Sequence, residues 1–461
     1  MLIDTHCHLD FKDFDPDRDE VIQRAKAAGI GTIINVGSSL EGSKRAVELS
    51  EKHDFIYASV GVHPHDAGSV TKAVFKELRA LALSKKVVAV GEVGLDYYRN
   101  LSPQDIQKKV FKEFISFSRE LGLPLIFHSR EAHHDLLDIL KKEFSTSSRT
   151  SKIRGVMHCF SGDPQFLREC LDAGLCISFT GNITFKNADR LRELARDVPL
   201  ERILLETDAP FLAPQVYRGR RNEPAYITFL AKELSGIYSL PVEDIARTTT
   251  HNANELFGLN IPEEPKIAYE IRDSLYLNIT NRCTNECCFC VRETTDYVKG
   301  HRLKLEKEPS SQEMLAALKD AAKYKEVVFC GYGEPTLRLD LIKEVARFLK
   351  DKGKTVRLIT NGHGNLIHKR SIVKELKGLI DKVSVSLNVD TKEKYNSLCR
   401  PQVGDDAFEA VISFIKECKK EGIKIEVTCL DLPETDIEKC RFIVENELDA
   451  EFRLRRHNVV G

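Results

Sequence analysis

The sequence predicts two consecutive α/β domains, of which the first is a (β/α)8 TIM barrel and the second a (β/α)6 partial barrel. Short β-branched runs alternate with longer amphipathic stretches along the chain, which is typical of sheets built from βα units. The chain has 461 residues, whereas single domains commonly have about 100–200 and barrels about 250. Two domains are therefore the expected organisation.

Eight runs in the first half have the length and residue types of buried strands, and a helical pattern follows each of them. They are Leu2–Asp4, Thr32–Val36, Ile56–Val60, Val87–Val93, Leu125–His128, Gly155–His158, Cys176–Phe179 and Ile203–Glu206. Eight such units in roughly 255 residues indicate a closed (β/α)8 barrel. We expect this first domain to span residues 1–259.

The hydrophobic periodicity is lost around Pro262–Pro265, so we expect residues 260–273 to form a linker. Six further strands are then predicted in residues 274–461, which we expect to form the second domain. They are Leu275–Ile279, Glu326–Cys330, Thr355–Thr360, Lys382–Leu387, Lys424–Cys429 and Glu451–Arg455. Six strands with intervening helices favour an open or partial barrel.

The composition excludes several classes of protein. With 42% hydrophobic and 30% charged residues, the chain can bury a core, which excludes wholesale disorder. No apolar run approaches the length of about 18 residues that a membrane span requires, and the N-terminus lacks the pattern of a signal peptide. The 13 cysteines therefore predict a reducing, cytoplasmic location. A net charge of −1 argues against a generally basic nucleic-acid coat, so any anion site must be local.

Potential metal ligands stand at the carboxyl ends of several predicted barrel strands, which converge on one rim. They are His6, His8, Glu92, His128, His158 and Asp208. Any one of these histidines alone could be an ordinary buried residue. Six candidates at matching strand ends favour a mixed nitrogen and oxygen site for one or two divalent ions, of the kind that supports phosphodiester displacement.

Longer motifs around these residues resemble the TatD family of metal-dependent deoxyribonucleases. The matching segments are Asp4–Asp10, Gly61–His65, Gly91–Tyr98, Leu205–Leu212 and Arg218–Pro224. They occur in order between Met1 and about Leu259, so the resemblance covers the whole first domain. It implies a TIM barrel that holds two divalent metal ions, Mg, Mn or Zn.

The resemblance also implies a role for each ligand. His6, His8 and Asp208 would bind one ion, His128 and His158 the other, and Glu92 would bridge the two. His63 would contact the substrate or support a ligand, so that Glu92, Asp208 and His63 form the expected catalytic set. The loop residues Arg218 and Arg221 are expected to contact substrate phosphates.

Members of the family act as 3′-directed exonucleases on DNA, some on RNA, and some are described as deacylases of mischarged tRNA. Nucleic acid is therefore the expected substrate of the first domain. Hydrolysis of a small-molecule or aminoacyl-tRNA ester or amide is the alternative.

A second constellation begins directly after the first strand of the second domain. Cys283, Cys287 and Cys290 form a C-x3-C-x2-C spacing, which suits three thiolate ligands of one iron–sulfur cluster with one iron left open. A zinc knuckle is the alternative, although no second Cys/His pair follows closely. The next strand ends in Cys330–Pro335, whose glycines permit close approach of a ligand.

These motifs, together with Thr360–Gly362, resemble the radical S-adenosylmethionine (SAM) superfamily, with Tyr332 interrupting its usual Gly-Gly-Glu pattern. The resemblance implies that the three cysteines bind a [4Fe-4S] cluster whose open iron chelates SAM. Cofactor contacts are expected from Phe289 on the adenine, from Gly331, Gly333 and Glu334 on the methionine amine, and from Ser386 and Asn388 on the ribose or carboxylate.

Taken together, the sequence predicts a bifunctional enzyme. Its second domain would cleave SAM to a 5′-deoxyadenosyl radical with electrons from a donor such as a flavodoxin or ferredoxin. Nucleic acid and small metabolites are both considered as substrates of that radical. An iron–sulfur sensor or a zinc module that regulates the hydrolase is the non-enzymatic alternative for this half.

Overall fold

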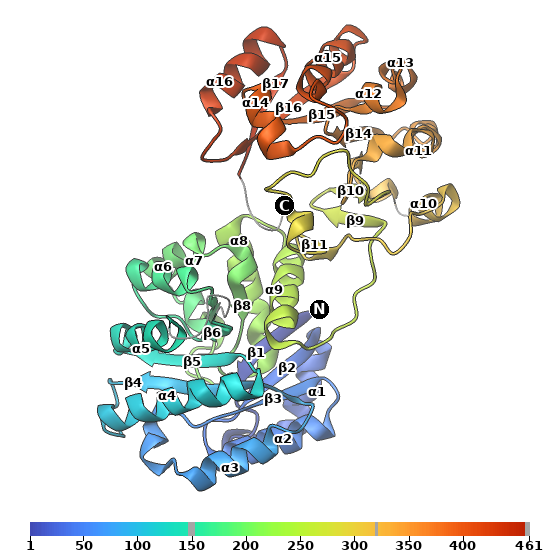
Figure 1. Cartoon of the computed structure of the whole chain (residues 1–461). Helices are drawn as coiled ribbons and strands as arrows, with labels where there is room; N and C mark the ends of the chain where they lie inside the picture. The colour runs from blue at the N-terminus through green and yellow to red at the C-terminus, as the bar shows by residue number, and fades with distance from the viewer. Residues whose placement is uncertain (146–152, 319–320, 457–461) are drawn as a thin grey trace. The chain divides into compact units, whose positions relative to one another are not determined.

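The computed structural model of the chain describes residues 1–145, 153–318 and 321–456 (Figure 1). Internal contacts divide the chain into two compact units, Met1–Ile261 and Pro262–Gly461. Each unit has its own large cluster of buried apolar side chains. The end of the predicted second domain, residues 457–461, lies outside the described residues.

The sheet of the first unit contains eight parallel strands that pair in the order of the sequence. They are β1 (Leu2–Cys7), β2 (Ile30–Val36), β3 (Ile56–Val60), β4 (Val87–Asp96), β5 (Leu125–Arg130), β6 (Gly155–Met157), β7 (Cys176–Phe179) and β8 (Ile203–Leu205). The ring closes where Cys7 bridges Ala209 and where the Asp208 N–H donates to the His6 carbonyl at 2.8 Å. The predicted eight-stranded barrel is confirmed.

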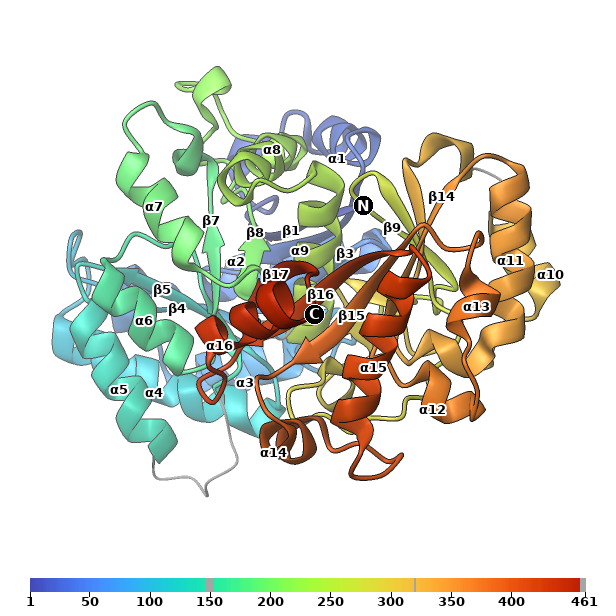
Figure 2. The same cartoon turned by 90° about the horizontal axis from the view of Figure 1, so that it is seen from above.

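Helices follow the strands and cover the outside of the barrel, as Figure 2 shows for α5, α6 and α7. They are α1 (Arg18–Ala27), α2 (Leu40–Lys52), α3 (Lys72–Leu81), α4 (Gln104–Leu121), α5 (His133–Ser145), α6 (Pro164–Asp172), α7 (Asp189–Asp197), α8 (Ile227–Tyr238) and α9 (Val242–Phe257). In α4, Val110, Phe114 and Phe117 recur at helical spacing and are buried. The helix ends at Gly122, which adopts a left-handed conformation with φ 67°.

The second unit is built on a mixed sheet with the strand order β17-β16-β15-β14-β13-β10-β9. Its strands are β9 (Ala268–Ile271), β10 (Ser274–Leu277), β13 (Glu326–Phe329), β14 (Thr355–Thr360), β15 (Lys382–Asn388), β16 (Lys424–Asp431) and β17 (Glu451–Arg456). The six predicted strands are present and parallel. A separate two-stranded ribbon joins β11 (Tyr297–Val298) to β12 (His301–Arg302).

Strand β9 corrects one expectation, because it lies within residues 260–273, where we expected only a linker. It pairs antiparallel with β10 at the edge of the sheet. The reason is local packing: Tyr269 on β9 is 5% exposed and its ring stacks with that of Tyr276, with centroids 5.4 Å apart. Only the segment before β9 lacks regular structure.

Helices of the second unit connect its parallel strands. They are α10 (Ser311–Ala317), α11 (Leu339–Asp351), α12 (Gly364–His368), α13 (Val373–Leu376), α14 (Lys392–Lys394), α15 (Ala407–Lys420) and α16 (Ile437–Phe442). A capping box between Ser310 and Glu313 starts α10. Among the helices of the described ranges, none combines the length and hydropathy that a membrane crossing requires.

The core of the second unit provides a direct test of its packing. Phe414 on α15 is fully buried, and we expect Phe414→Ala to lower the free energy of unfolding of this unit by about 3–5 kcal/mol, because it leaves a cavity. Urea denaturation followed by circular dichroism measures the change. Phe442→Ala removes a ring that is 56% exposed and should alter stability by less than about 0.5 kcal/mol. Equal effects of the two changes would contradict the packing described here.

Candidate functional site

The predicted metal ligands meet at the carboxyl-end rim of the first barrel. His6 lies on β1 and His8 directly after it, whereas Glu92 lies on β4. His128 comes from β5, His158 follows β6, and Asp208 follows β8. The parallel strands end at one level of the barrel, which is why residues as far apart in sequence as His6 and Asp208 converge.

One group consists of His6, His8 and Asp208, which were expected to bind the first ion. Their ligand atoms all lie within 4.8 Å of one another. The Nε2 atoms of His6 and His8 are 3.2 Å apart, and Asp208 Oδ1 is 3.7 Å from the first and 3.5 Å from the second. Two ring nitrogens that face each other beside a carboxylate oxygen form a donor set suited to a divalent cation.

A second group surrounds the other side of Glu92. Glu92 Oε1 lies 2.6 Å from His128 Nδ1 and 2.8 Å from His158 Nε2, the residues expected to bind the second ion. His63 Nε2 is 3.6 Å from the same oxygen, and the ligand atoms of His63, Glu92 and His128 also lie within 4.8 Å of one another. His63 therefore stands with these potential ligands.

Glu92 lies between the two groups, with one oxygen toward each. While Oε1 faces His128 and His158, Oε2 is 3.5 Å from His6 Nε2 and 3.8 Å from His8 Nε2. The residue is only 4% exposed. This is the arrangement that a carboxylate bridging two cations requires.

The electrostatics of the cluster suit cation binding. Burial disfavours the charged form of Glu92, but the neighbouring histidines, His158 foremost, hold the pKa of this carboxyl well below its usual range. Burial lowers the pKa of His6 and lowers that of His63 to about 3. Although burial opposes it, neighbouring carboxylates raise the pKa of His8 to about 9 and also raise the pKa values of His128 and His158. Metal ions bind ionised carboxylates and neutral imidazoles, so a cation at this site would displace the protons of these three rings. The residues therefore fit a divalent metal centre.

Asp96 is part of this centre, although we assigned it no role from the sequence. Its Oδ2 lies 3.1 Å from His128 Nε2 and 3.0 Å from His65 Nε2, and its Oδ1 accepts the Arg99 N–H at 2.8 Å. A carboxylate in this position fixes the orientation of the histidine that it contacts. Asp96 follows Glu92 by four residues on β4, an even spacing typical of one strand face, and this spacing was the available signal.

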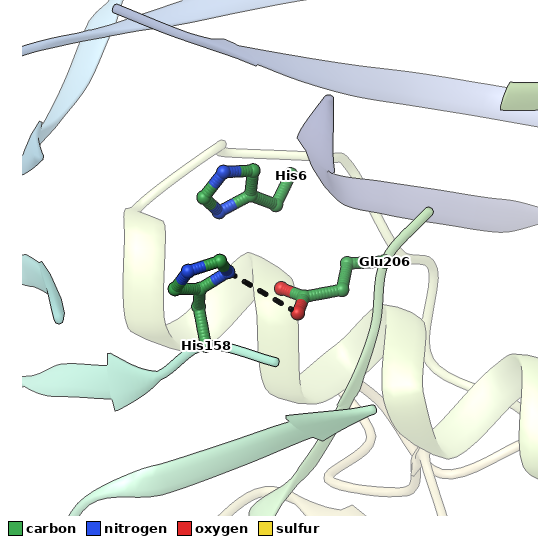
Figure 3. Close-up of side chains that lie close together, drawn as sticks. All are labelled: His6, His158 and Glu206. Carbon is green, nitrogen blue, oxygen red and sulfur yellow. Dashed lines mark ion pairs between the residues drawn. The ribbon is translucent and has the colours of Figure 1, made fainter. Parts of the chain in front are cut away.

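Glu206 is a second missed residue and stands behind His158 (Figure 3). Its Oε1 is 3.6 Å from His158 Nδ1 and accepts the Cys159 N–H at 2.6 Å. The rings of His6 and His158 stack face to face, with centroids 4.2 Å apart. Glu206 is fully buried, and its ligand atom lies within 4.8 Å of those of His6 and His158, so it is a further potential metal ligand.

Asp4 connects β1 to the segment that carries Asp208. Its carboxylate accepts the Thr207 N–H at 2.9 Å and the Thr207 hydroxyl at 2.6 Å. Burial raises the pKa of Asp4 to about 8. This buried contact holds the ends of β1 and β8 together and thereby positions the first ligand group.

The two arginines expected to contact phosphate have different surroundings. Arg221 donates from Nη1 and Nη2 to the two carboxylate oxygens of Asp17, each at 2.7 Å. Arg218 is exposed, and its guanidinium lies 4.5 Å from the ring centre of Phe185. Arg221 thus already has an anionic partner within the chain, whereas Arg218 faces solvent. Contact of either with phosphate stays a prediction.

In the second unit, Cys283, Cys287 and Cys290 lie on the loop that follows β10, and each is partly buried. Cys288, between them, is exposed. The loop is attached to residues 398–400, since the Cys288 N–H donates to the Leu398 carbonyl at 2.9 Å. Cys287 has the Cys399 thiol as a hydrogen-bond partner, and the three thiols are not among the groups of described residues whose ligand atoms all lie within 4.8 Å of one another. The three-thiolate iron–sulfur site stays a prediction.

A network of buried hydrogen bonds attaches the cysteine loop to the core of the second unit. The Asn361 amide donates to Thr284 Oγ1 at 2.7 Å, Thr284 Oγ1 lies 3.0 Å from His363 Nδ1, and His363 Nε2 lies 2.9 Å from the Tyr395 hydroxyl. Burial lowers the pKa of His363 to about 4, so the ring is neutral. His363 and Tyr395 could not be identified from the sequence, because neither belongs to a recognised motif spacing.

The carboxylate of Glu334 forms its hydrogen bonds with other residues of the chain. It is 3% exposed and accepts four hydrogen bonds, which come from the Thr336 N–H and hydroxyl, the Thr360 hydroxyl at 2.7 Å and the Asn361 N–H at 2.7 Å. The carboxylate therefore joins the ends of β13 and β14 beneath the cysteine loop. Its expected contact with the methionine amine stays a prediction.

The two glycines before Glu334 are required by close packing. A Cβ atom on Gly331 would lie 2.3 Å from Asn278 Oδ1, and one on Gly333 would lie 2.2 Å from the Arg282 carbonyl oxygen. Neither position has room for a side chain, because the cysteine loop passes directly over the segment. This packing explains the glycines without a ligand.

The remaining expected SAM contacts are placed as follows. Phe289 is partly buried against the core of the second unit. Ser386 and Asn388 lie on β15, where Asn388 adopts a left-handed φ of 68° and its Nδ2 is 3.8 Å from Cys399 Sγ. The cofactor roles of these three residues stay predictions.

The role of Asp96 can be tested through metal affinity. We expect Asp96→Asn to weaken binding of Mn²⁺ about 10- to 100-fold, because the charged partner of His128 and His65 is lost. Isothermal titration calorimetry measures the affinity. Asp135→Asn is the matched control, since Asp135 pairs with Tyr97 and Lys108 away from the ligands. Unchanged affinity in Asp96→Asn would show that Asp96 does not support the centre.

Two family models match the chain. That of the TatD related DNases covers residues 3–258, and that of the radical SAM superfamily covers residues 277–443. Among curated proteins, an uncharacterized metal-dependent hydrolase, YabD, of Bacillus subtilis is 43% identical over 260 residues, which are 56% of this chain and 100% of that protein. A 3′-5′ ssDNA/RNA exonuclease, TatD, of Pantoea ananatis is 37% identical over 264 residues, with shares of 56% and 100%.

Solved structures of TatD-family proteins are also similar to the first unit. The crystal structure of YjjV, a TatD homologue from Escherichia coli, has 32% sequence identity and a TM-score of 0.53 and covers 57% of this chain and 98% of its own. A TatD-family hydrolase from Entamoeba histolytica has 26% identity and a TM-score of 0.51. The chain is therefore an enzyme of the TatD-related DNase family, whose metal-dependent hydrolase barrel is followed by a radical SAM domain.

Proposed function

We propose that the barrel hydrolyses phosphodiester bonds of nucleic acid, removing nucleotides from the 3′ end of DNA. The observation that carries this proposal is the position of the Glu92 carboxylate, with one oxygen toward each of two histidine groups. Two-metal centres of this kind stabilise the attacking and the leaving oxygen of a phosphodiester displacement. The relative from Pantoea ananatis, named for exonuclease action on single-stranded DNA and RNA, supports the assignment.

The candidate ligands of the barrel would bind two metal ions in two groups. His6, His8 and Asp208 would hold one divalent ion, Mg, Mn or Zn, and His128 and His158 the other, with Glu92 between them. When bound, the ions lower the pKa of a water molecule and neutralise phosphate charge.

The groups around these ligands would fix and complete the centre. Asp96 would keep the ring of His128 in its orientation, and Glu206 stands beside His158. His63, neutral and 14% exposed at its side chain, would face the substrate and contact it. Arg218 would contact a phosphate further along the strand.

For the second unit, we propose reductive cleavage of SAM to a 5′-deoxyadenosyl radical that acts on an unidentified substrate. Cys283, Cys287 and Cys290 would hold a [4Fe-4S] cluster, which supplies the electron for this cleavage. The chain keeps the loop in place through Thr284 and His363. A reduced flavodoxin or ferredoxin in the cytoplasm would deliver the electron.

The two activities can be separated by single substitutions. We expect Glu92→Gln to lower 3′ exonuclease activity more than about 100-fold, since even groups that merely orient ligands contribute 10- to 100-fold. Release of 5′-deoxyadenosine from SAM by the same anaerobic, reduced protein should be unchanged. Cys287→Ala should abolish release of 5′-deoxyadenosine and leave the exonuclease activity unchanged. It should also lose bound iron, which iron and sulfide analysis measures.

Cys288→Ala is the matched control for Cys287→Ala, because it removes the exposed neighbouring thiol and should keep the iron. If Glu92→Gln or Cys287→Ala abolished both activities in folded protein, the two sites would not be independent. If wild-type protein cut neither DNA nor RNA but hydrolysed an ester of aminoacyl-tRNA or of a metabolite, the proposed substrate would be wrong.

A further inference from the structure

An exposed aromatic ring stands beside the first ligand group. Phe211 follows Asp208 by three residues, and 51% of its surface is exposed. Its ring centre lies 6.4 Å from that of His8 and 5.9 Å from that of Phe11, edge-on to both. Phe11 in turn stacks on His8 at 4.6 Å. The two phenylalanines thus form an apolar wall next to a potential metal ligand.

The backbone holds Phe211 in this exposed position. Its N–H donates to the Asp208 carbonyl at 2.8 Å, and its carbonyl accepts the Asn222 amide at 2.7 Å. Asn222 is 1% exposed and also donates to the Thr207 carbonyl at 2.9 Å. The ring is therefore presented by an ordered backbone, which reduces the entropy cost of binding a partner.

The chemistry around Phe211 points to a flat, apolar partner. Tyr98, the other exposed aromatic residue near the ligand-bearing strands, carries the Arg130 guanidinium 3.9 Å from its ring centre. Within the described residues, no cation lies on the Phe211 ring. A single exposed ring is too small for a protein interface, which needs a patch of several hundred Å². A nucleobase has the right size, and stacking on an aromatic side chain is how single strands are bound.

We propose that Phe211 stacks against the nucleobase next to the phosphate that enters the metal centre. This inference rests on the proposed nuclease function and adds a residue that contacts base rather than phosphate. Because every base has a flat face, the contact tolerates any sequence but requires that a base be present. It also requires an unpaired strand end, since the bases of a duplex are already stacked on one another.

The test compares two single-stranded DNA oligonucleotides that differ only at the 3′ end. One carries normal nucleotides there, and the other carries a stable abasic analogue. The readout is the ratio of kcat/KM for the two strands, measured with full-length protein and Mn²⁺. We expect wild-type protein to prefer the base-bearing strand and Phe211→Ala to lower this ratio about 5- to 150-fold, the span expected for stacking one base.

Three further variants define the result. Phe211→Leu keeps an apolar side chain without a ring and should lose the preference as Phe211→Ala does, whereas Phe211→Trp should retain it. Phe442→Ala removes another exposed ring and should match wild type. If Phe211→Leu kept the wild-type ratio, stacking by Phe211 would be wrong. If wild-type protein cleaved neither strand, the proposed nuclease function would fail instead.

Discussion

The buried carboxylate of Glu92 is the group on which the organisation of the first unit depends. Five imidazole nitrogens, from His6, His8, His63, His128 and His158, lie between 2.6 and 3.8 Å from its oxygens. A buried carboxylate is costly unless positive charge compensates it. In the free protein the histidines, His158 foremost, supply that charge, and divalent cations between Glu92 and the two histidine groups would replace it. The closed barrel is what brings the strand ends together around this one residue.

In both units, buried polar groups behind the candidate ligands keep those ligands in place. Asp96 and Glu206 contact histidines of the barrel, while Asp4 closes the seam between β1 and β8. In the second unit, Glu334 and His363 take the same supporting part beneath the cysteine loop. Parallel strands end at the same edge, so supporting residues lie close to candidate ligands from other strands. Such contacts link residues far apart in sequence.

The separation in sequence of the contacting residues explains which features of the fold and site could be predicted and which could not. The parallel strands and the convergence of the six candidate ligands were predictable, because β-branched runs and strand-end histidines are visible locally. Asp96 was missed because its importance comes from His128 on another strand. Strand β9 was hidden in a proline-rich and charged segment, where only the packing of Tyr269 identifies it. Gly331 and Gly333 correctly indicated that other atoms lie close to the backbone at these positions. A sequence does not show whether those atoms belong to a bound ligand or to another segment of the same chain.

The central claim is that Glu92 bridges two metal ions, and electron paramagnetic resonance of Mn²⁺-loaded protein tests it most directly. Metal ions in two-metal sites are about 3.5–4 Å apart, and a shared carboxylate couples their electron spins. We predict the spectrum of an exchange-coupled Mn²⁺ pair at two ions per chain, converted to that of isolated ions in Glu92→Gln. A spectrum of isolated Mn²⁺ at full loading of the wild-type protein, or binding of one ion only, would contradict the account.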